Sequence, residues 1–188
     1  RYRPNLLVAM MNGVGGQTRL EYASMATLAG NRLPYPAWVL TRQEVFDGVH
    51  ATPAGSTTFR YRDAAYDAED AEFRGFRLVW QEDAGGRPTA TEFHQDDTRA
   101  GLVERVSILG VATCTASDAL SPSDPCSPWN TPLEVRENAW PESSPVLLAS
   151  RVATPFHRGT AIPELAKHLE YDYDAYGNVI EENRPHAK

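Results

Sequence analysis

The chain has 188 residues, a formal net charge of −7 and 41% apolar residues, which suits one domain with a core or a slice of a larger structure. The acidic balance argues against a nucleic-acid partner, because such a groove needs clustered Lys and Arg to neutralise phosphates. The longest apolar run, 6–11, is far too short to span a bilayer, so no membrane insertion by this segment is expected. The sequence begins without an initiator Met or a secretory leader, as a piece of a longer protein also would.

The first residues predict a hairpin. Residues 6–11 read as a buried strand, Asn12–Gly16 as a glycine-rich turn and 17–23 as an alternating strand. A phosphate-binding loop is the alternative for the turn, but that loop needs a following helix and usually a nearby Lys. Strand-like alternation follows instead, which favours the hairpin.

More strands are predicted at short intervals, over 37–46, 57–62, 73–81 and 89–94. Turns at Asp47-Gly48 and Asp83–Gly86 separate them. The acidic stretch 66–70 is interpreted as a solvated loop rather than a calcium site, because the EF-hand spacing is missing. Plentiful Pro and Gly without long helical periodicity favour an antiparallel meander over a βαβ fold.

The second half is less regular. Residues 102–109 alternate as a strand, whereas 111–145 read as a Pro/Ser-rich surface loop that Trp129 and Trp140 pin to the sheet. Cys114 and Cys126 in this loop form either a disulfide or two free thiols. A zinc site is not expected, because the sequence lacks the Cys/His cluster that would bind zinc. Another strand is expected over 146–152, and at most two helical turns over 163–169 with Thr160 as a cap.

The end of the chain predicts a second hairpin. Leu169, Tyr171 and Tyr173 alternate with acidic residues, as in a half-buried strand. Asp174–Asn178 supplies the turn, because the Asp side chain can bond back to the backbone and Gly177 can take a positive φ. Val179 and Ile180 restart a β-branched run.

These motifs together resemble a known family. Tyr173-Asp174-x-x-Gly177-Asn178 is similar to the signature of YD (Rhs) repeats, which build β-stranded shells in secreted bacterial proteins. Five earlier segments, in order, resemble the middle region of the B component of insecticidal Tc toxin complexes: Asn12-Gly13-x-Gly15-x-x-Thr18-Arg19-x-x-Tyr22-Ala23-Ser24, Leu33-Pro34-Tyr35-Pro36, Phe59-Arg60-Tyr61, Glu72-Phe73-Arg74-Gly75-Phe76 and Thr91-x-Phe93-His94. The likeness covers 6–106 well and 146–182 loosely, and it fails between them.

The resemblance implies an all-β fold, an antiparallel hairpin meander whose open sheet forms part of a YD-repeat shell. It divides the chain into a toxin-like meander (1–110), a loop insertion (111–145) and strands leading into a YD hairpin (146–188). It further implies a non-catalytic, secreted segment without cofactor or metal, which helps to enclose or dock a toxic C-terminal polypeptide. Its partners would be other segments of the same polypeptide and the toxin-complex subunits. The residues expected to carry the structural motif are Asn12, Gly13, Gly15, Arg74, Gly75, Tyr173, Asp174, Gly177 and Asn178.

Two other functions stay open. A free-standing extracellular module could bind sugar or protein through Trp38, Trp80, Trp129 or Trp140, since exposed aromatic clusters mark such sites. A hydrolase could use His94, which lies near Asp96 and Asp97. No Gly-x-Ser-x-Gly elbow, His-Glu-x-x-His helix or nucleotide loop accompanies that histidine, so catalysis is not expected.

Overall fold

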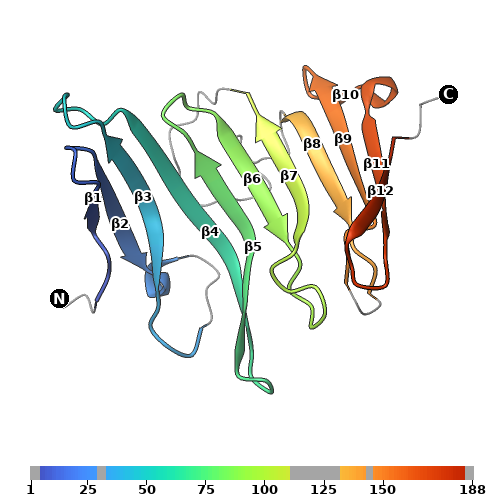
Figure 1. The fold of residues 1–188 in the computed structure, drawn as a ribbon. Coiled ribbons are helices and arrows are strands. Elements are labelled where there is room, and N and C mark those ends of the chain that lie inside the picture. Colours follow the sequence, from blue (N-terminus) through green and yellow to red (C-terminus); the bar gives the residue numbers. More distant parts are fainter. Residues whose placement is uncertain (1–4, 29–32, 111–131, 143–145, 185–188) are drawn as a thin grey trace.

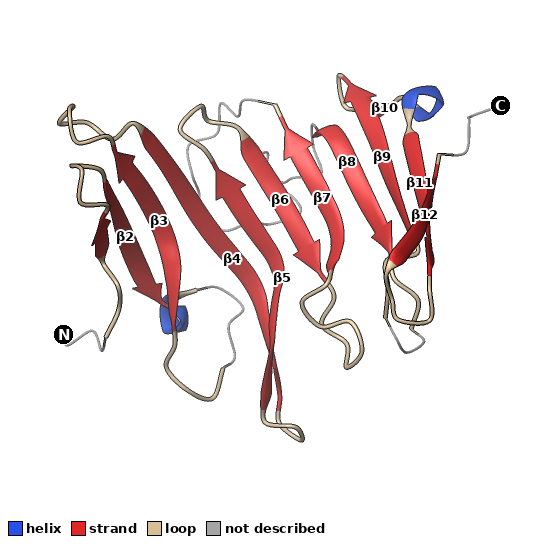
Figure 2. Cartoon of the chain, viewed as in Figure 1, coloured by secondary structure: helices blue, strands red, loops and turns tan. Residues whose placement is uncertain are grey.

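The computed structural model describes residues 5–28, 33–110, 132–142 and 146–184. Within these ranges lies one open 12-stranded sheet in which every paired strand is antiparallel (Figures 1 and 2). The strands are β1 (Ala9–Met11), β2 (Gln17–Ser24), β3 (Trp38–Phe46), β4 (Gly55–Asp67), β5 (Glu72–Glu82), β6 (Pro88–Phe93), β7 (Val103–Leu109), β8 (Pro132–Ala139), β9 (Ser150–His157), β10 (Thr160–Ala161), β11 (Lys167–Tyr173) and β12 (Val179–Asn183). The predicted all-β antiparallel meander is confirmed.

Spatial order follows sequence order from β1 to β9 and continues through β11 to β12, while β10 folds back onto β9. β4 and β5 are the longest strands, and their hairpin projects beyond the neighbouring loops (Figure 1). Short 3-10 turns at Met25–Thr27 (η1) and Pro163–Leu165 (η2) are the helices of the described residues. Neither is long and apolar enough to cross a membrane.

The core lies at the centre of the sheet. Leu78, Trp80, Ala90 and Leu109 form one buried cluster on β5, β6 and β7. Trp80 stands directly opposite Ala90, and Ala90 opposite Ser107, so these side chains share a face. The outer strands are more exposed: at the β1 edge the Met11 side chain is 78% exposed.

The structure corrects the prediction for the first strand. Only Ala9–Met11 of the stretch 6–11 is a strand, and it is an exposed edge rather than a buried element. β1 has β2 as its single neighbour in the sheet, so its apolar side chains gain little cover. The acidic loop is also shorter than predicted, because Tyr66 and Asp67 still belong to β4.

The second half contains three more differences. The prediction of a loop over 111–145 is wrong in part, because 132–139 form β8, which pairs with β7 and β9. Residues 111–131 and 143–145 lie outside the described ranges. The strand expected over 146–152 begins only at Ser150. The predicted helix is a single 3-10 turn without a side-chain cap, since Thr160 belongs to β10 and Lys167 already begins β11.

Candidate functional site

The β1–β2 turn is organised by Asn12. Its Oδ1 accepts hydrogen bonds from the backbone N–H groups of Val14 (3.0 Å) and Gly16 (2.9 Å). Gly13 and Gly15 have φ values of 78° and 98°, as the predicted turn requires. The turn also packs against the β3–β4 loop, where a β-carbon on Gly48 would overlap the backbone of Gly15. Asn12, Gly13 and Gly15 therefore shape one corner of the sheet.

Arg74 is the centre of a second site. Its guanidinium lies 3.3 Å from Asp67, 2.8 Å from Asp70 and 2.9 Å from Glu72, all at the β4–β5 turn. It also lies 3.1 Å from Asp97 of the β6–β7 loop. Because only 8% of the side chain is exposed, Arg74 is a nearly buried cation that joins two loops distant in sequence.

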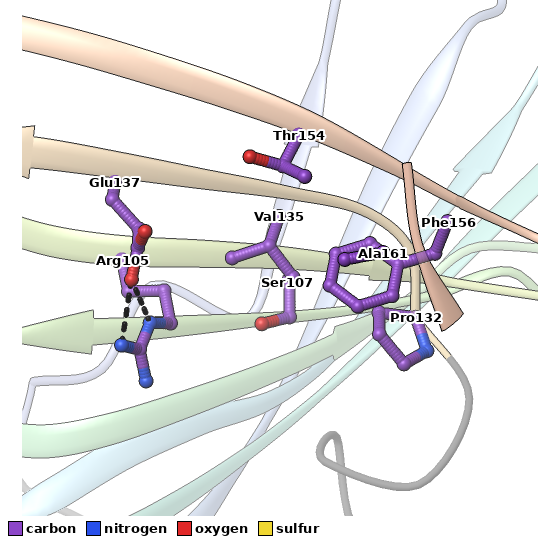
Figure 3. A pocket seen from close by; sticks show the side chains of 8 residues that line it. All are labelled: Arg105, Ser107, Pro132, Val135, Glu137, Thr154, Phe156 and Ala161. Atoms are coloured by element: carbon purple, nitrogen blue, oxygen red, sulfur yellow. Dashed lines mark hydrogen bonds and ion pairs between the residues drawn. The ribbon is translucent and has the colours of Figure 1, made fainter. Parts of the chain in front are cut away.

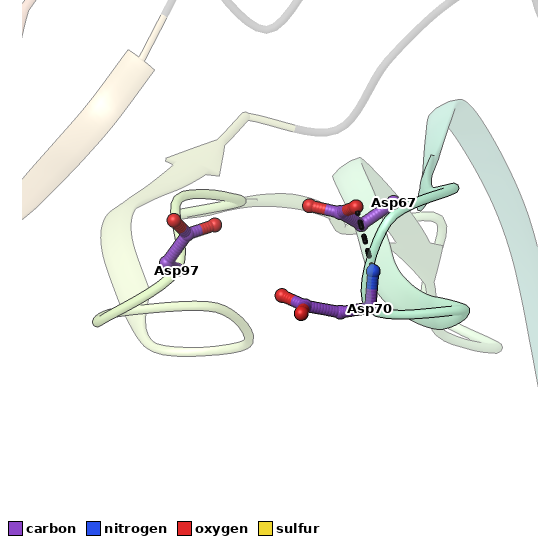
Figure 4. A group of neighbouring side chains, drawn as sticks. All are labelled: Asp67, Asp70 and Asp97. Carbon is purple, nitrogen blue, oxygen red and sulfur yellow. Dashed lines mark hydrogen bonds between the residues drawn. The ribbon is translucent and has the colours of Figure 1, made fainter.

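The three aspartates of this cluster face one another across the two loops (Figure 4). Asp67, Asp70 and Asp97 have carboxylate oxygens close enough together to hold a metal ion, but the Arg74 guanidinium already contacts all three. Backbone N–H groups of Asp70 and Glu69, and then Arg74, hold the pKa of Asp67 below its ordinary value. Burial alone would lower the pKa of Arg74, yet its carboxylate partners raise it. The Arg74 side chain therefore supplies the positive charge for these three carboxylates.

A third set of contacts ties the β6–β7 loop to both of its neighbours. The Gln95 side chain donates to the carbonyls of Asp63 (2.8 Å) and Gly75 (3.0 Å). On the other side, Arg99 pairs with Glu142 at 3.1 Å and donates to the Trp140 carbonyl at 3.4 Å. We name the β4–β5, β6–β7 and β8–β9 connections, residues 68–71, 94–102 and 140–149 where described, the rim loops.

Trp140 lies in the β8–β9 rim loop, and Gly75 lies on β5 beside the β4–β5 rim loop. The Trp140 indole N–H donates to the Val103 carbonyl at 2.7 Å, so this tryptophan pins its segment to the sheet as predicted, while Trp129 lies outside the described residues. Gly75 has a φ of 87° where the β4–β5 register shifts between Ala65 and Tyr66.

The β11–β12 hairpin confirms the predicted turn chemistry. Asp174 Oδ1 accepts from the N–H groups of Tyr176 (2.8 Å) and Asn178 (2.9 Å), and Gly177 has a φ of 83°. The Asn178 side chain donates to Asp174 Oδ2 at 2.9 Å, and this bond is the foremost reason why the pKa of Asp174 is lowered. The Tyr173 hydroxyl donates to the Leu148 carbonyl at 2.8 Å, which fastens the hairpin to the chain before β9.

Charged side chains also cross the centre of the sheet. Arg105 Nη1 lies 3.7 Å from Glu92 Oε1 on one neighbouring strand, and Arg105 Nη2 lies 2.7 Å from Glu137 Oε1 on the other. We name this row, Glu92–Arg105–Glu137, the charge ladder. Burial raises the pKa of Glu92, although Arg105 and Arg77 act against that effect. Arg77 also pairs with Glu104, and this bond is the main cause of that carboxyl's lowered pKa.

A groove of about 350 Å³ lies beside the charge ladder (Figure 3). Its floor is the cross-strand row Ser107, Val135 and Thr154, one end is the Arg105–Glu137 ion pair, and the other end is apolar. The apolar end consists of Pro132, Phe156 and Ala161. The groove offers a neutral, amphipathic surface.

The residues predicted to carry the structural motif do not converge. They occupy the β1–β2 turn, the β4–β5 hairpin and the β11–β12 turn, and each group stabilises its own turn. Sequence reasoning named Asp97 only as a neighbour of His94, and it missed Arg99 and the charge ladder. Arg74 as the partner of Asp97, Glu142 as a partner of Arg99, and the ladder partners all lie far away along the chain. Asp67 and Asp70 stood within the acidic stretch, but only the fold reveals Arg74 as their partner.

The chain is a β-sheet segment with a structural role. Its sheet is open, its rim loops are joined by ion pairs and hydrogen bonds, and the charge ladder crosses its centre. The chain belongs to the family described as the insecticide toxin TcdB middle/N-terminal region, whose model matches residues 1–104. This is the middle region of the Tc toxin B component, as the resemblance implied.

Solved Tc toxin structures share the fold. A TcdB2-TccC3 crystal structure is 16% identical with a TM-score of 0.61, and the match covers 96% of this chain and 12% of that one. A TcdB2-TccC3-Cdc42 structure is 17% identical with a TM-score of 0.61, covering 93% and 12%. The Photorhabdus luminescens Tc holotoxin pore is 17% identical with a TM-score of 0.60, covering 97% and 12%. The chain thus spans about an eighth of these proteins, and no curated protein sequence matches it.

Proposed function

We propose that the chain is a non-catalytic segment of the β-shell of a bacterial Tc-like toxin, and that this shell encloses or docks a toxic C-terminal polypeptide. The terminal hairpin is the first unit of a YD-repeat series in this proposal. The partners are other segments of the same polypeptide and the other toxin-complex subunits, and the assembly is secreted.

The observation that carries the proposal is the open sheet with two unpaired edges. Among the described residues, β1 and β12 each pair with a strand on one side only. Both edges carry exposed apolar side chains, including Met11 at 78% and Ile180 at 66% exposure. Exposed apolar edge strands favour pairing with further strands, so this sheet is suited to continue into a larger one.

The similar structures support the choice of assembly. They are TcdB2-TccC3 structures and a Tc holotoxin pore, and the present sheet matches part of those chains. A shell segment needs stable curvature and linked loops more than reactive groups. The rim loops and the charge ladder supply such links within the described residues.

The other two functions receive less support. Trp80 is 3% exposed and so offers no aromatic platform, and the Trp140 indole N–H is already bonded to the backbone. His94 lies 3.6 Å from Asp96, whose carboxylate also binds Arg99. In the described part of the chain, no hydrogen bond joins a histidine to a serine, the contact that nucleophilic catalysis by serine would use.

Protease protection tests the proposal in the full-length polypeptide that carries this chain. The parent should protect its C-terminal polypeptide from added protease. Ala90→Asp should expose it, because Ala90 is 2% exposed in the sheet core and a charge there opens the sheet. Val14→Asp is the matched control, since Val14 is 86% exposed.

Equal digestion of the C-terminal polypeptide in the parent and in Ala90→Asp would contradict enclosure.

The edges give a second check: the 188-residue chain alone should self-associate, and Met11→Lys with Ile180→Lys should reduce that association. An isolated chain that stayed monomeric at high concentration would argue against a shell segment.

A further inference from the structure

The apolar pattern of β8 says little about its register. Its sequence, Pro132 to Ala139, contains charged or amide side chains on both faces, and Leu133 is 51% exposed. Register in a sheet is normally fixed because a one-residue slip moves the apolar set to the wrong face. That penalty is small in β8, because Leu133 and Ala139 on its more apolar face are exposed and the same face carries Glu137. Another feature must select the pairing of β7 with β8.

The charge ladder lies where such a feature is needed. Glu92 is directly opposite Arg105, and Arg105 is directly opposite Glu137, so three strands contribute alternating charges to one row. Glu92 is 9% exposed, and Arg77 reaches it from β5 at 3.4 Å. A buried carboxylate is tolerated when it is paired and becomes costly when its partner moves away.

Shifting either strand pair by one residue breaks this row in a specific way. A slip between β7 and β8 places Arg105 opposite Arg136 or Asn138 instead of Glu137. A slip between β6 and β7 places Glu92 opposite Glu104 or Val106 instead of Arg105. In each case one direction brings like charges together and the other leaves a charge without its opposite.

We propose that the Glu92–Arg105–Glu137 charge ladder specifies the register of β6, β7 and β8, and that Glu104 and Arg136 act against the one-residue slips. Between β7 and β8 the ladder selects among pairings in which the apolar side chains of β8 gain little burial, and between β6 and β7 it acts together with the core packing of Ala90 and Leu109. Polar groups that fix register are the best supported structural use of buried charges. This role concerns the internal order of the sheet, and its test does not depend on what the shell encloses.

Disulfide trapping in the full 188-residue chain distinguishes the registers. Cys114→Ser and Cys126→Ser first remove the natural cysteines. Ser107→Cys with Val135→Cys reports the observed register, because these residues are directly opposite. Ser107→Cys with Glu134→Cys reports the slipped register, in which Arg105 faces Arg136.

Arg105→Glu reverses the preference. It places three acidic side chains in one row in the observed register, whereas the slipped register offers Arg136 as a partner. We expect the 107–134 cross-link to rise roughly fivefold and the 107–135 cross-link to fall. Adding Glu137→Arg restores opposite charges between β7 and β8 and should restore the 107–135 product. Arg158→Glu, at an exposed turn, makes the same charge change as a control.

A folded Arg105→Glu chain that gives only the 107–135 cross-link at the parental yield would overturn the proposal. If that variant does not fold, as judged by circular dichroism, Arg105→Met replaces it, because Met keeps an aliphatic stem and removes only the charge. The slipped product must then exceed the parental level; the parental distribution of cross-links would again overturn the proposal.

Discussion

Asp174 and Gly177 have separate tasks in the terminal turn. The carboxylate accepts two backbone N–H groups and one side-chain amide, and the glycine takes the positive φ. A β-carbon at Gly177 would meet only Leu147 at ordinary contact distance. The need for glycine here is therefore one of backbone conformation rather than of space.

Gly177→Val should lower the free energy of unfolding by about 1–2 kcal/mol, because a β-carbon opposes the left-handed region. Asp174→Ala should destabilise less, since part of the turn's backbone bonding remains. Urea unfolding measures both, and Gly55→Val is the control, because Gly55 has no positive φ and open space around it. If Gly177→Val has the same free energy of unfolding as the control, the prediction that glycine relieves backbone strain at this turn is wrong.

Such residue-scale features were the most predictable from the sequence. The Asn12 and Asp174 turns rest on bonds within four residues, so the local sequence contains both partners. The role of Arg74 was not predictable in the same way. Its partner Asp97 lies on another loop, and only the fold brings the two together.

At the scale of elements, the β6–β7 loop connects its two neighbouring rim loops. Arg74→Met should release the β4–β5 side of that connection, because Asp97 and three further carboxylates lose their shared cation. We expect amide hydrogen exchange within 94–102 to become roughly tenfold faster, as a loop with fewer tethers opens more often. Arg62→Met is the control, since Arg62 lies on β4 and forms an ion pair with the adjacent Asp63. Unchanged exchange in 94–102 would show that Gln95 and Arg99 hold the loop without Arg74.

Elements were predicted well where the apolar alternation was strong. β4 and β5 carry Phe59, Tyr61, Leu78 and Trp80 at two-residue spacing, and both strands were found from the sequence. β8 was missed because Glu137 interrupts the alternation of Leu133, Val135 and Ala139 with polar residues, and because the strand lies within a Pro-rich stretch. η2 is a single turn, within the two turns at most that the sequence predicts, and the pairing of Lys167–Glu170 with β9 limits its length.

At the scale of the whole molecule, the carboxylates predict loss of stability in acid. Asp47 has a pKa of about 2, because it accepts bonds from the backbone N–H and the ring of His50 and from the Val49 N–H. The pKa values of Asp67, Asp96, Glu104 and Asp174 are also lowered. Groups of this kind stabilise the folded state above their unfolded pKa, and that contribution is lost as the pH falls toward the folded value.

Urea unfolding from about pH 6 down to about pH 2 should therefore show a falling free energy of unfolding, mainly below about pH 4.5. Glu92 acts with the opposite sign: its pKa is raised, so protonation on acidification favours the folded state. Glu92→Gln should consequently make the fall steeper. A stability that stayed constant down to about pH 2 would contradict the pairing of these carboxylates.

The strand order has a consequence for how the sheet assembles in time. Each strand from β1 to β9 pairs with the next one along the chain, so no strand must wait for a distant partner. Contacts that are local in sequence favour fast folding, and a nascent chain can add one strand after another as it is synthesised. The one long closure joins Leu109 to Pro132, and it costs roughly 1–2 kcal/mol more entropy than a short hairpin turn. We therefore expect the docking of β8 onto β7 to follow the formation of the N-terminal hairpins, so that the sheet assembles in an earlier N-terminal and a later C-terminal part.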